Sequence, residues 1–386
     1  MRLTLVTETF LPQVNGVSRT LSHLVDELTL LGDSVQVVHP HYGGTAPSVD
    51  RVAVRSITLP WYKDVCLPIP PFGKAHRAIE AFRPDLVHIA TEATLGLSTL
   101  LHVRRRGIPV VTSFHTNWNQ YSGHYGVGFA RGIIMGYLRW FHRRAIETYV
   151  PSLATIAELE TCGFRNLKLW PRGVDGKLFR PSRPNRLQLR SSLGFSPDDV
   201  VIGHVSRLAV EKNVAYLAEA LKLVGEARPQ ARFLFVGDGP SRPELEALMG
   251  EHARFVGYRT GEDLADHYSA CDLFAFASLT ETFGNVVLEA MATGLPVVAV
   301  RAGGVGDIVQ PGETGALVDP SEPASVFAQD LIDLIDNLEK RRRLSEAARR
   351  HAESQTWPAI MGGLRERYLS VVAACEKKKK VVANVL

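Results

Sequence analysis

The stretch that decides the fold is residues 200–205, Val-Val-Ile-Gly-His-Val, followed by a short loop and a helix that starts near Glu211-Lys212-Asn213. A run that is almost wholly apolar is typical of a strand buried on both faces of a parallel sheet. Similar runs recur at residues 3–6, 34–39, 86–90, 110–114, 148–151, 232–236, 254–257, 273–277 and 296–300. The repeated order of strand, turn and helix predicts doubly wound α/β structure in both halves of the chain.

The length predicts two domains, because 386 residues exceed one core at roughly 150 residues per domain. Residues 180–190, rich in Pro, Arg and Asn, are the predicted linker. We therefore expect domains over residues 1–190 and 191–370, with a cleft between them. The helical stretch 357–372 is expected to cross back over the cleft, and the basic tail 371–386 to be disordered.

Composition excludes several classes of protein. The 44 Lys and Arg nearly balance 40 Asp and Glu, and the run Lys377 to Lys380 equals the whole surplus, so no basic face for nucleic acid is expected. The four cysteines have no paired spacing, which indicates a reducing compartment without a disulfide framework or structural zinc. No signal peptide or membrane-spanning run is recognisable, so we expect a cytoplasmic protein.

Ligands of an open parallel sheet bind beyond the carboxyl ends of its strands, so we examined the loops at that edge. The turn Asn15-Gly16 allows backbone to approach a ligand at a helix start, although an ordinary turn explains it equally well. His115 follows the fourth run, either as a reactive group or as a hydrogen-bonded structural histidine. Gly237 and Gly239 allow close approach to a phosphate or sugar, or form a tight turn.

Two charged pairs give stronger signals. Arg207 and Lys212 suit a diphosphate, the alternative being solvated surface charges. Glu281 and Glu289 flank a strand-to-helix junction, where amides near Gly284 would bind an anion and the carboxylates would accept hydrogen bonds from sugar hydroxyls. A glycosidase pair is disfavoured, because one regular helix would separate the acids by roughly 12 Å, beyond the about 5 to 9.5 Å of hydrolytic pairs.

These motifs resemble the retaining GT-B glycosyltransferases of family 4 over nearly the whole chain. The resemblance rests on Glu-x7-Glu at residues 281–289, the upstream Arg-x4-Lys, and residues 8–12 and 171–175. It implies two Rossmann-like domains, the first binding a lipid or glycan acceptor and the second a nucleotide sugar. Within the family, the chain resembles GDP-mannose-dependent α-mannosyltransferases and the sulfoquinovosyl and glucuronosyl diacylglycerol group. GDP-mannose is the favoured donor, and a UDP-hexose or UDP-hexuronate is the alternative.

The resemblance also implies roles for single residues. His115 would contact the transferred sugar, Glu281 its hydroxyls and Glu289 the ribose, while Arg207 and Lys212 would hold the diphosphate. The implied catalytic residues are His115, Glu281, Arg207 and Lys212. The implied donor-binding residues are Gly16, Arg207, Lys212, Arg259, Glu281, Phe283, Gly284, Asn285, Val286 and Glu289.

The expected reaction breaks the sugar–phosphate bond through an oxocarbenium-like state. Arg207 and Lys212 would neutralise the leaving diphosphate. The chain contains no Asp-x-Asp motif, so we expect neither a metal nor another cofactor. Retention would follow from attack on the face that the diphosphate leaves, and a double displacement through a protein nucleophile is the alternative.

A peripheral contact with an anionic membrane surface, on the inner face of the cytoplasmic membrane, is a further expectation. Residues 129–144 mix apolar and basic side chains as an interfacial helix does, although a core helix with solvated arginines fits as well. Lys377 to Lys380 would add about 1 kcal/mol each near anionic lipid. Two rival functions are a nucleotide-sugar epimerase of the same fold and a non-enzymatic sensor of nucleotide sugars. The sequence leaves the nucleotide, sugar, acceptor, linkage and oligomeric state open.

Overall fold

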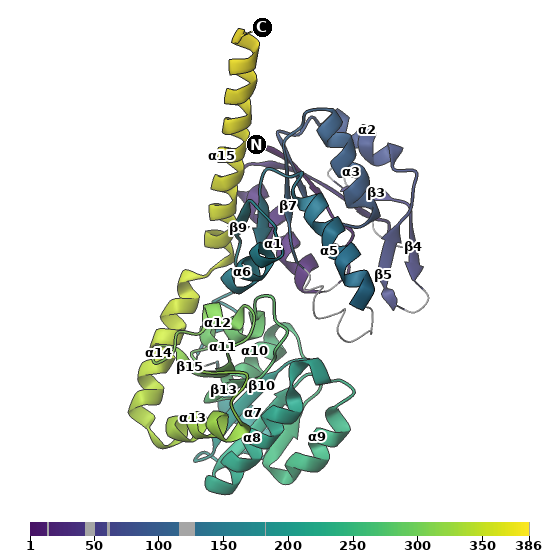
Figure 1. The fold of residues 1–386 in the computed structure, drawn as a ribbon. Coiled ribbons are helices and arrows are strands. Elements are labelled where there is room, and N and C mark those ends of the chain that lie inside the picture. Colours follow the sequence, from purple (N-terminus) through teal and green to yellow (C-terminus); the bar gives the residue numbers. More distant parts are fainter. Residues whose placement is uncertain (14, 43–50, 60–61, 116–127, 182, 386) are drawn as a thin grey trace. The chain divides into compact units, whose positions relative to one another are not determined.

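The computed structural model describes residues 1–386 except 14, 43–50, 60–61, 116–127, 182 and 386. The chain divides into two compact units, each built around a parallel sheet (Figure 1). Unit 1 comprises Met1–Pro171 and Trp357–Leu386, and unit 2 comprises Arg172–Thr356. The predicted pair of doubly wound α/β folds is confirmed.

The sheet of unit 1 is seven-stranded and parallel, in the order β3-β2-β1-β6-β7-β8-β9. The order reverses between β1 and β6, which places the loops after these strands at the edge where such sheets bind ligands. The strands are β1 (Arg2–Val6), β2 (Ser34–Pro40), β3 (Arg51–Val54), β6 (Leu86–Ile89), β7 (Val110–Ser113), β8 (Thr148–Val150) and β9 (Leu167–Leu169), and β4 (Ser56–Leu59) with β5 (Tyr62–Pro68) forms a separate antiparallel hairpin.

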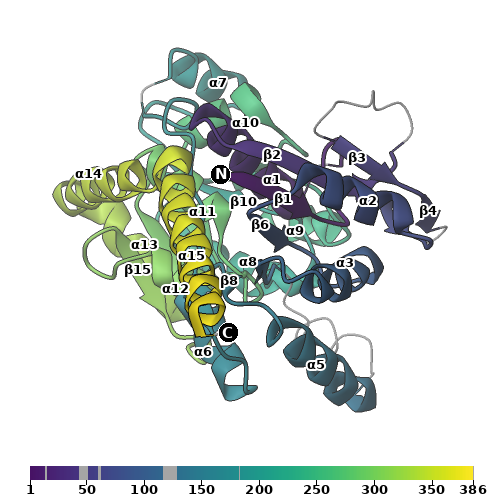
Figure 2. The ribbon, with the colours of Figure 1, turned by 90° about the horizontal axis from the view of Figure 1, so that it is seen from above.

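Helices cover both faces of this sheet. On one face α1 (Gly16–Leu30) lies beside α15 (Trp357–Val385) (Figure 2). Leu24 and Leu364 share a core with Leu5 of β1. On the other face Val6 packs in a core with Leu100. The helices there are α2 (Gly73–Phe82), α3 (Thr94–Arg105) and the end of α5 (Gly128–His142), while α6 (Leu153–Thr161) packs near β8 and β9.

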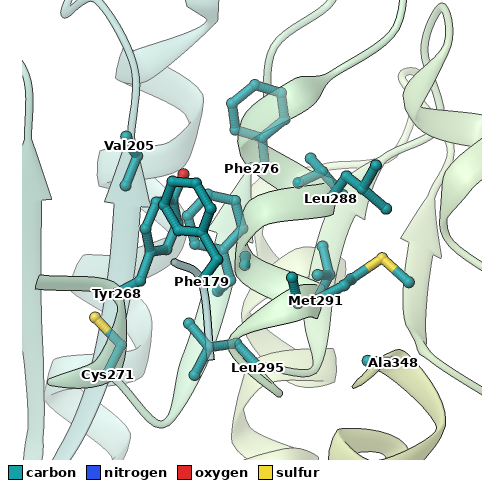
Figure 3. Close-up of a cluster of buried hydrophobic side chains, with 14 of the residues drawn as sticks. Phe179, Val205, Tyr268, Cys271, Phe276, Leu288, Met291, Leu295 and Ala348 are labelled. Carbon is teal, nitrogen blue, oxygen red and sulfur yellow. The ribbon is translucent and has the colours of Figure 1, made fainter. Parts of the chain in front are cut away.

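The sheet of unit 2 is six-stranded and parallel, in the order β12-β11-β10-β13-β14-β15. Its strands are β10 (Val200–Val205), β11 (Ala231–Val236), β12 (Ala253–Phe255), β13 (Leu273–Phe276), β14 (Val297–Val300) and β15 (Gly315–Val318). The helices on one face are α10 (Gly261–Ser269), α11 (Asn285–Ala292), α12 (Val305–Ile308) and α14 (Leu338–Ser354), and those on the other are α8 (Val214–Ala227), α9 (Arg242–Met249) and α13 (Ala324–Asp336). Tyr268, Leu288 and Met291 lie in the first of these two cores (Figure 3).

The compact units differ from the predicted domains 1–190 and 191–370. Residues 180–190 do not form a free linker, because α7 (Arg186–Ser192) begins within them. Arg190 is buried and donates to Asp272 at 2.9 Å, which attaches α7 to the body of unit 2. Attachment to a distant carboxylate leaves no local pattern in the sequence, and a stretch rich in Pro and Arg therefore looks like a linker.

The C-terminal segment returns to the first unit, as a helix that crosses back was expected to do, but this return differs from the predicted domain bounds 191–370. Residues 357–386 belong to unit 1, because α15 packs on α1 and Arg365 donates to Asp33 at 2.6 Å. The tail 371–386 is not disordered as far as it is described, since α15 continues to Val385. Within the described residues, no helix combines the length and the apolar character needed to cross a membrane.

Candidate functional site

The centre of the candidate site is a charge pair in unit 2. Strands β10 and β13 are direct neighbours in the sheet, so the loops that follow them meet at one edge. Lys212 follows β10 and Glu281 follows β13, and Lys212 Nζ lies 2.5 Å from Glu281 Oε1. The Ser278 hydroxyl donates to the same oxygen at 3.2 Å. The structure therefore joins the two residues that the resemblance assigned to the diphosphate and to the sugar.

Arg207 also has a carboxylate partner, Glu211, at the same edge of the sheet. Burial alone would raise the pKa of Glu211, but its own backbone amide, Arg207 and Lys212 together hold that pKa below its ordinary value. Glu211 is therefore ionised near neutral pH. A diphosphate bound to Arg207 and Lys212 would share these cations with Glu211 and Glu281, so its affinity would depend on all four side chains.

Helix α11 begins where the sequence placed it, directly after Gly284. Gly284 is the N-cap with φ of 108°, a left-handed conformation that favours glycine, and Phe283 before it is buried. The amides of Asn285 and Val286 donate to no acceptor among the described residues, and Asn285 Oδ1 is buried without a hydrogen-bond partner there. A helix start with unpaired amides suits an anionic group, and Asn285 Oδ1 suits a hydroxyl or N–H of the same ligand.

A glycine pair that the sequence analysis missed supports the loop of Glu281. Gly303 has φ of 51°, and a Cβ atom there would lie 2.0 Å from the Glu281 carbonyl oxygen. The Gly304 amide donates to that carbonyl at 3.0 Å, and a Cβ on Gly304 would lie 2.5 Å from Phe283 Cα. Backbone packs directly on backbone, so side chains at these positions would displace Glu281. The available signal was a Gly-Gly pair separated by two residues from the end of the predicted strand 296–300.

Glu289 lies on the second turn of α11 and contacts a residue that the sequence analysis also missed. The Tyr268 hydroxyl lies 3.0 Å from Glu289 Oε2 and 3.1 Å from the Val286 carbonyl. Burial, and then the charge of Glu289, raises the pKa of Tyr268 well above its ordinary value, so this hydroxyl stays a neutral donor. The Tyr268 ring packs edge-on against Phe179 (Figure 3), which fixes the hydroxyl and with it the carboxylate.

Arg259 is held by its own loop rather than by the charge pair. Its Nε donates to the Val256 carbonyl at 3.0 Å, and its Nη1 donates to Asp263 at 3.0 Å, at the start of α10. Among the described residues, Arg259 forms no hydrogen bond or ion pair with Lys212 or Glu281. Arg259 therefore lies after β12 and is anchored by residues of its own loop and of α10.

The glycines after β11 have a structural explanation. A Cβ on Gly237 would lie 1.9 Å from the Ser206 carbonyl oxygen, and one on Gly239 would lie 2.3 Å from the Leu208 carbonyl oxygen. The loop after β11 thus crosses the loop after β10 with backbone in contact. This packing supports the tight-turn interpretation of both glycines.

Gly16 lies in unit 1, at the first position of α1. The preceding Asn15 forms a capping box with Ser18. Apart from its chain neighbours and its own helix, a Cβ on Gly16 would meet no atom of the described residues within 4 Å, so their packing inside unit 1 does not require glycine there. The loop is anchored upstream, because the Glu8 carboxylate accepts hydrogen bonds from the Leu95 amide at 2.9 Å and from further amides at the start of α3.

His115 also lies in unit 1, directly after β7. Its Nε2 lies 2.7 Å from Ser113 Oγ, and its ring contacts Trp170 edge-on with centroids 5.6 Å apart. His115 is partly buried, whereas Trp170 and Ser113 are buried. Gly16 and His115 thus belong to unit 1, and every other predicted site residue belongs to unit 2.

Two protein families match most of the chain. Residues 14–177 match the family described as Glycosyltransferase Family 4, and residues 185–351 match the family described as Glycosyl transferases group 1. A GDP-mannose-dependent alpha-mannosyltransferase of Mycobacterium tuberculosis is 36% identical over 384 residues, covering 96% of this chain and 97% of the relative. Sulfoquinovosyl transferase SQD2 of Arabidopsis thaliana is 34% identical over 378 residues, covering 95% of this chain and 73% of the relative.

The fold is shared with solved glycosyltransferases. Sucrose-phosphate synthase from Thermosynechococcus elongatus superposes with a TM-score of 0.75 and 23% identity, covering 97% of this chain and 99% of that one. The resemblance that rested on Glu-x7-Glu and Arg-x4-Lys is confirmed by these comparisons. The chain belongs to the GT-B glycosyltransferases of family 4 and is an enzyme that transfers sugar.

Proposed function

We propose that this enzyme transfers a mannosyl unit from GDP-mannose to a lipid or glycan acceptor, with retention of the anomeric configuration. The mannosyltransferase relative, which aligns with nearly the whole chain, supports this donor. The observation that carries the proposal is the Lys212–Glu281 pair, which lies after β10 and β13, with a helix start of unpaired amides following Glu281. Such a group offers contacts to a diphosphate and to the sugar attached to it.

Each side chain has a distinct task in the proposed reaction. The amides of Asn285 and Val286, with Lys212 and Arg207, would stabilise the charge that grows on the leaving diphosphate. Glu281 would accept hydrogen bonds from sugar hydroxyls, and its pairing with Lys212 holds that carboxylate in one orientation. These contacts need no metal ion, and we propose metal-independent transfer.

The remaining residues would act at the two ends of the donor. Glu289, held by Tyr268, would accept hydrogen bonds from the ribose hydroxyls. Gly16 would allow the start of α1 to approach the donor phosphate, since among the described residues a Cβ at this position would meet nothing within 4 Å beyond its chain neighbours and its own helix. His115 would contact the transferred sugar, and the acceptor would attack on the face that the diphosphate leaves.

A membrane contact is part of the proposal for lipid acceptors. On α5 the side chains of Ile133 and Trp140 are exposed, and the Arg144 guanidinium lies 3.8 Å from the Trp140 ring centroid. Exposed apolar groups beside arginines suit the boundary of an anionic leaflet. Lys377 to Lys380 are exposed near the end of α15 and would add attraction. Side chains of residues 129–131, within the predicted interfacial segment, lie outside the described part.

A UDP-hexose or UDP-hexuronate diacylglycerol glycosyltransferase is the second candidate. The relative that favours it is the sulfoquinovosyl transferase, at 34% identity over most of this chain. The two candidates share every residue role given above and differ in the nucleotide and in the sugar that is transferred. The base is expected to contact the loop after β12, where Arg259 lies. The residues of that loop do not distinguish guanine from uracil.

The deciding experiment offers purified enzyme GDP-mannose, UDP-glucose and UDP-glucuronate with vesicles that contain diacylglycerol or phosphatidylinositol. We expect transfer from GDP-mannose, and an α-linked product by the one-bond carbon–proton coupling at the anomeric centre. Transfer from a UDP sugar alone would replace the first candidate by the second. An inverted product would contradict retention, and an epimerised sugar formed without acceptor would establish the rival epimerase activity.

A further inference from the structure

A continuous chain of hydrogen bonds runs through the core of unit 1 from His115 to the C-terminal helix. His115 Nε2 lies 2.7 Å from Ser113 Oγ, Ser113 Oγ lies 2.8 Å from His88 Nε2, and His88 Nδ1 lies 2.7 Å from the Tyr368 hydroxyl. Ser113, His88 and Tyr368 are fully buried. Tyr368 lies on α15, 280 positions from His88, so the end of the chain supplies the last member.

The hydrogen bonds of Tyr368 and His88, at the far end of this series from His115, have a defined direction of donation. The Tyr368 hydroxyl contacts no acceptor other than His88 Nδ1 among the described residues, and a buried hydroxyl that kept its proton unpaired would be costly. Tyr368 therefore donates to His88 Nδ1. Burial lowers the pKa of His88 to about 3, so the ring is neutral and carries one proton. That proton must lie on Nε2, which donates to Ser113 Oγ.

The direction continues to His115. Ser113 Oγ already accepts a hydrogen bond from His88, so its own proton is directed to the remaining neighbour, His115 Nε2. An imidazole that accepts at Nε2 and is neutral carries its proton on Nδ1. The buried chain thus selects one of the two tautomers that a neutral His115 could adopt.

We propose that Tyr368, His88 and Ser113 are positioning residues that hold neutral His115 as its Nδ1–H tautomer. Resting on the proposed function, the consequence is that the second ring nitrogen of His115 is an N–H donor rather than an acceptor, so any contact of this nitrogen with the transferred sugar would be a donation to a sugar oxygen. In the other tautomer Nδ1 of His115 would be an acceptor, and a sugar hydroxyl would have to donate to it instead. The C-terminal helix therefore contributes to the chemistry of unit 1 through Tyr368, beyond its packing on α1.

The direct test is nitrogen NMR of protein labelled in histidine, since two-bond proton correlations distinguish protonated from unprotonated ring nitrogens. The signals of His115 are assigned from their loss in His115→Gln. In the wild-type enzyme, at a pH where His115 is neutral, we expect a protonated Nδ1 and an unprotonated Nε2. A wild-type ring with its proton on Nε2 would overturn the proposal.

Two variants interrupt the chain at different places. Ser113→Ala removes the hydroxyl that donates to His115. Tyr368→Phe removes the hydroxyl whose donation to His88 Nδ1 sets the direction of the other hydrogen bonds. Both should shift His115 toward a mixture of tautomers. They should also lower kcat for transfer by about tenfold, the rate equivalent of one lost hydrogen bond. The affinity for free nucleotide should not change, because neither Ser113 nor Tyr368 is among the residues assigned to it.

Tyr149→Phe is the matched control. The Tyr149 ring lies 5.7 Å from the Tyr368 ring and 5.9 Å from the His88 ring, but its hydroxyl donates to Glu147 instead of to the chain. This variant should keep the wild-type tautomer and kcat. An equal tautomer shift in Tyr149→Phe and Tyr368→Phe would show that packing of the aromatic cluster sets the tautomer, and the proposal would be wrong.

The two proposals fail in different ways. If the wild-type enzyme transfers no sugar from any donor, the proposed function fails, while the NMR experiment still decides the tautomer. If transfer occurs and both Ser113→Ala and Tyr368→Phe retain the wild-type spectrum and kcat, the hydrogen-bond chain has no positioning role. Melting temperatures of the variants show whether each one folds before either result is interpreted.

Discussion

Lys212 and Glu281 form an ion pair in this enzyme, although 69 positions separate them in the sequence. Their side chains are each about one-fifth exposed, at 20% and 21%, and they meet because β10 and β13 are adjacent. A substitution of either residue therefore changes the electrostatic surroundings of the other. The effects of Lys212 and Glu281 variants should consequently not be additive.

Lys212→Ala should weaken binding of the free nucleoside diphosphate. The loss should be roughly 1.5 to 3 kcal/mol, the value of a hydrogen bond to a charged group. Lys222→Ala is the matched control, because this exposed lysine on α8 removes the same charge from unit 2 without contacting the pair. Calorimetric titration of both variants measures the difference, and equal affinities would show that Lys212 does not bind the diphosphate.

Variants of Glu281 and Glu289 should have different effects on ligand affinity in a binding experiment. Glu289→Gln should weaken free nucleotide and intact donor by similar factors, because both carry the ribose. Glu281→Gln should lower kcat/KM for the donor, whereas affinity for free nucleotide should stay unchanged or rise, since Lys212 loses its competing carboxylate. A loss of nucleotide binding in Glu281→Gln as severe as in Glu289→Gln would contradict the division of roles.

Gly303→Ala should impair transfer through the loop of Glu281. A Cβ there meets the Glu281 carbonyl oxygen at 2.0 Å, so the loop must move, and we expect a lower melting temperature and a lower kcat/KM. Gly312→Ala provides the control, because Gly312 also has positive φ, of 78°, but no atom lies within 4 Å of its Cβ position. If Gly312→Ala lowers kcat/KM equally, backbone strain rather than displacement of Glu281 explains the loss.

Chelation should leave transfer intact. The proposed charge on the leaving diphosphate is met by Lys212, Arg207 and the amides at the start of α11. Rates measured after dialysis against EDTA should equal those measured in added Mg²⁺ or Mn²⁺. If chelation abolished activity and either ion restored it, a metal would help to neutralise the leaving diphosphate. That result would contradict the prediction.

The ion pair between Arg365 and Asp33 should stabilise unit 1 in a pH-dependent way. Burial alone would raise the pKa of Asp33, but Arg365 and the Met1 amine hold it below the ordinary 3.8. Because the pKa of Asp33 is lower in the folded state, the ion pair stabilises the fold at pH values above the ordinary pKa. This stabilisation disappears as the pH falls through the lowered pKa.

Arg365→Met should therefore lower the free energy of unfolding by about 1 kcal/mol at neutral pH, as expected for a partly exposed pair. The difference from wild type should shrink as the pH falls below about 4. The control is Arg367→Met, an exposed arginine on the same helix. Denaturant titrations across pH measure both variants, and a difference that did not depend on pH would contradict the assignment.

The sequence by itself determined the fold class, the central strands and the start of α11. The runs at residues 200–205 and 273–277 became β10 and β13, because strands buried on both faces must be almost wholly apolar. Gly284 preceded α11 as predicted, because a left-handed N-cap favours glycine. Strands β3, β9 and β15 were not predicted, since they are short, lie at sheet edges and are only partly buried.

Only the tertiary structure decided which residues meet. The pairing of Lys212 with Glu281, the support of Glu289 by Tyr268 and the contact of Tyr368 with His88 join residues 69, 21 and 280 positions apart. The return of α15 to unit 1 likewise joins parts of the chain that are far apart in the sequence. Local patterns report the burial of each residue and the period of its element, whereas such contacts depend on the order of strands in the sheet and on which helix covers each face.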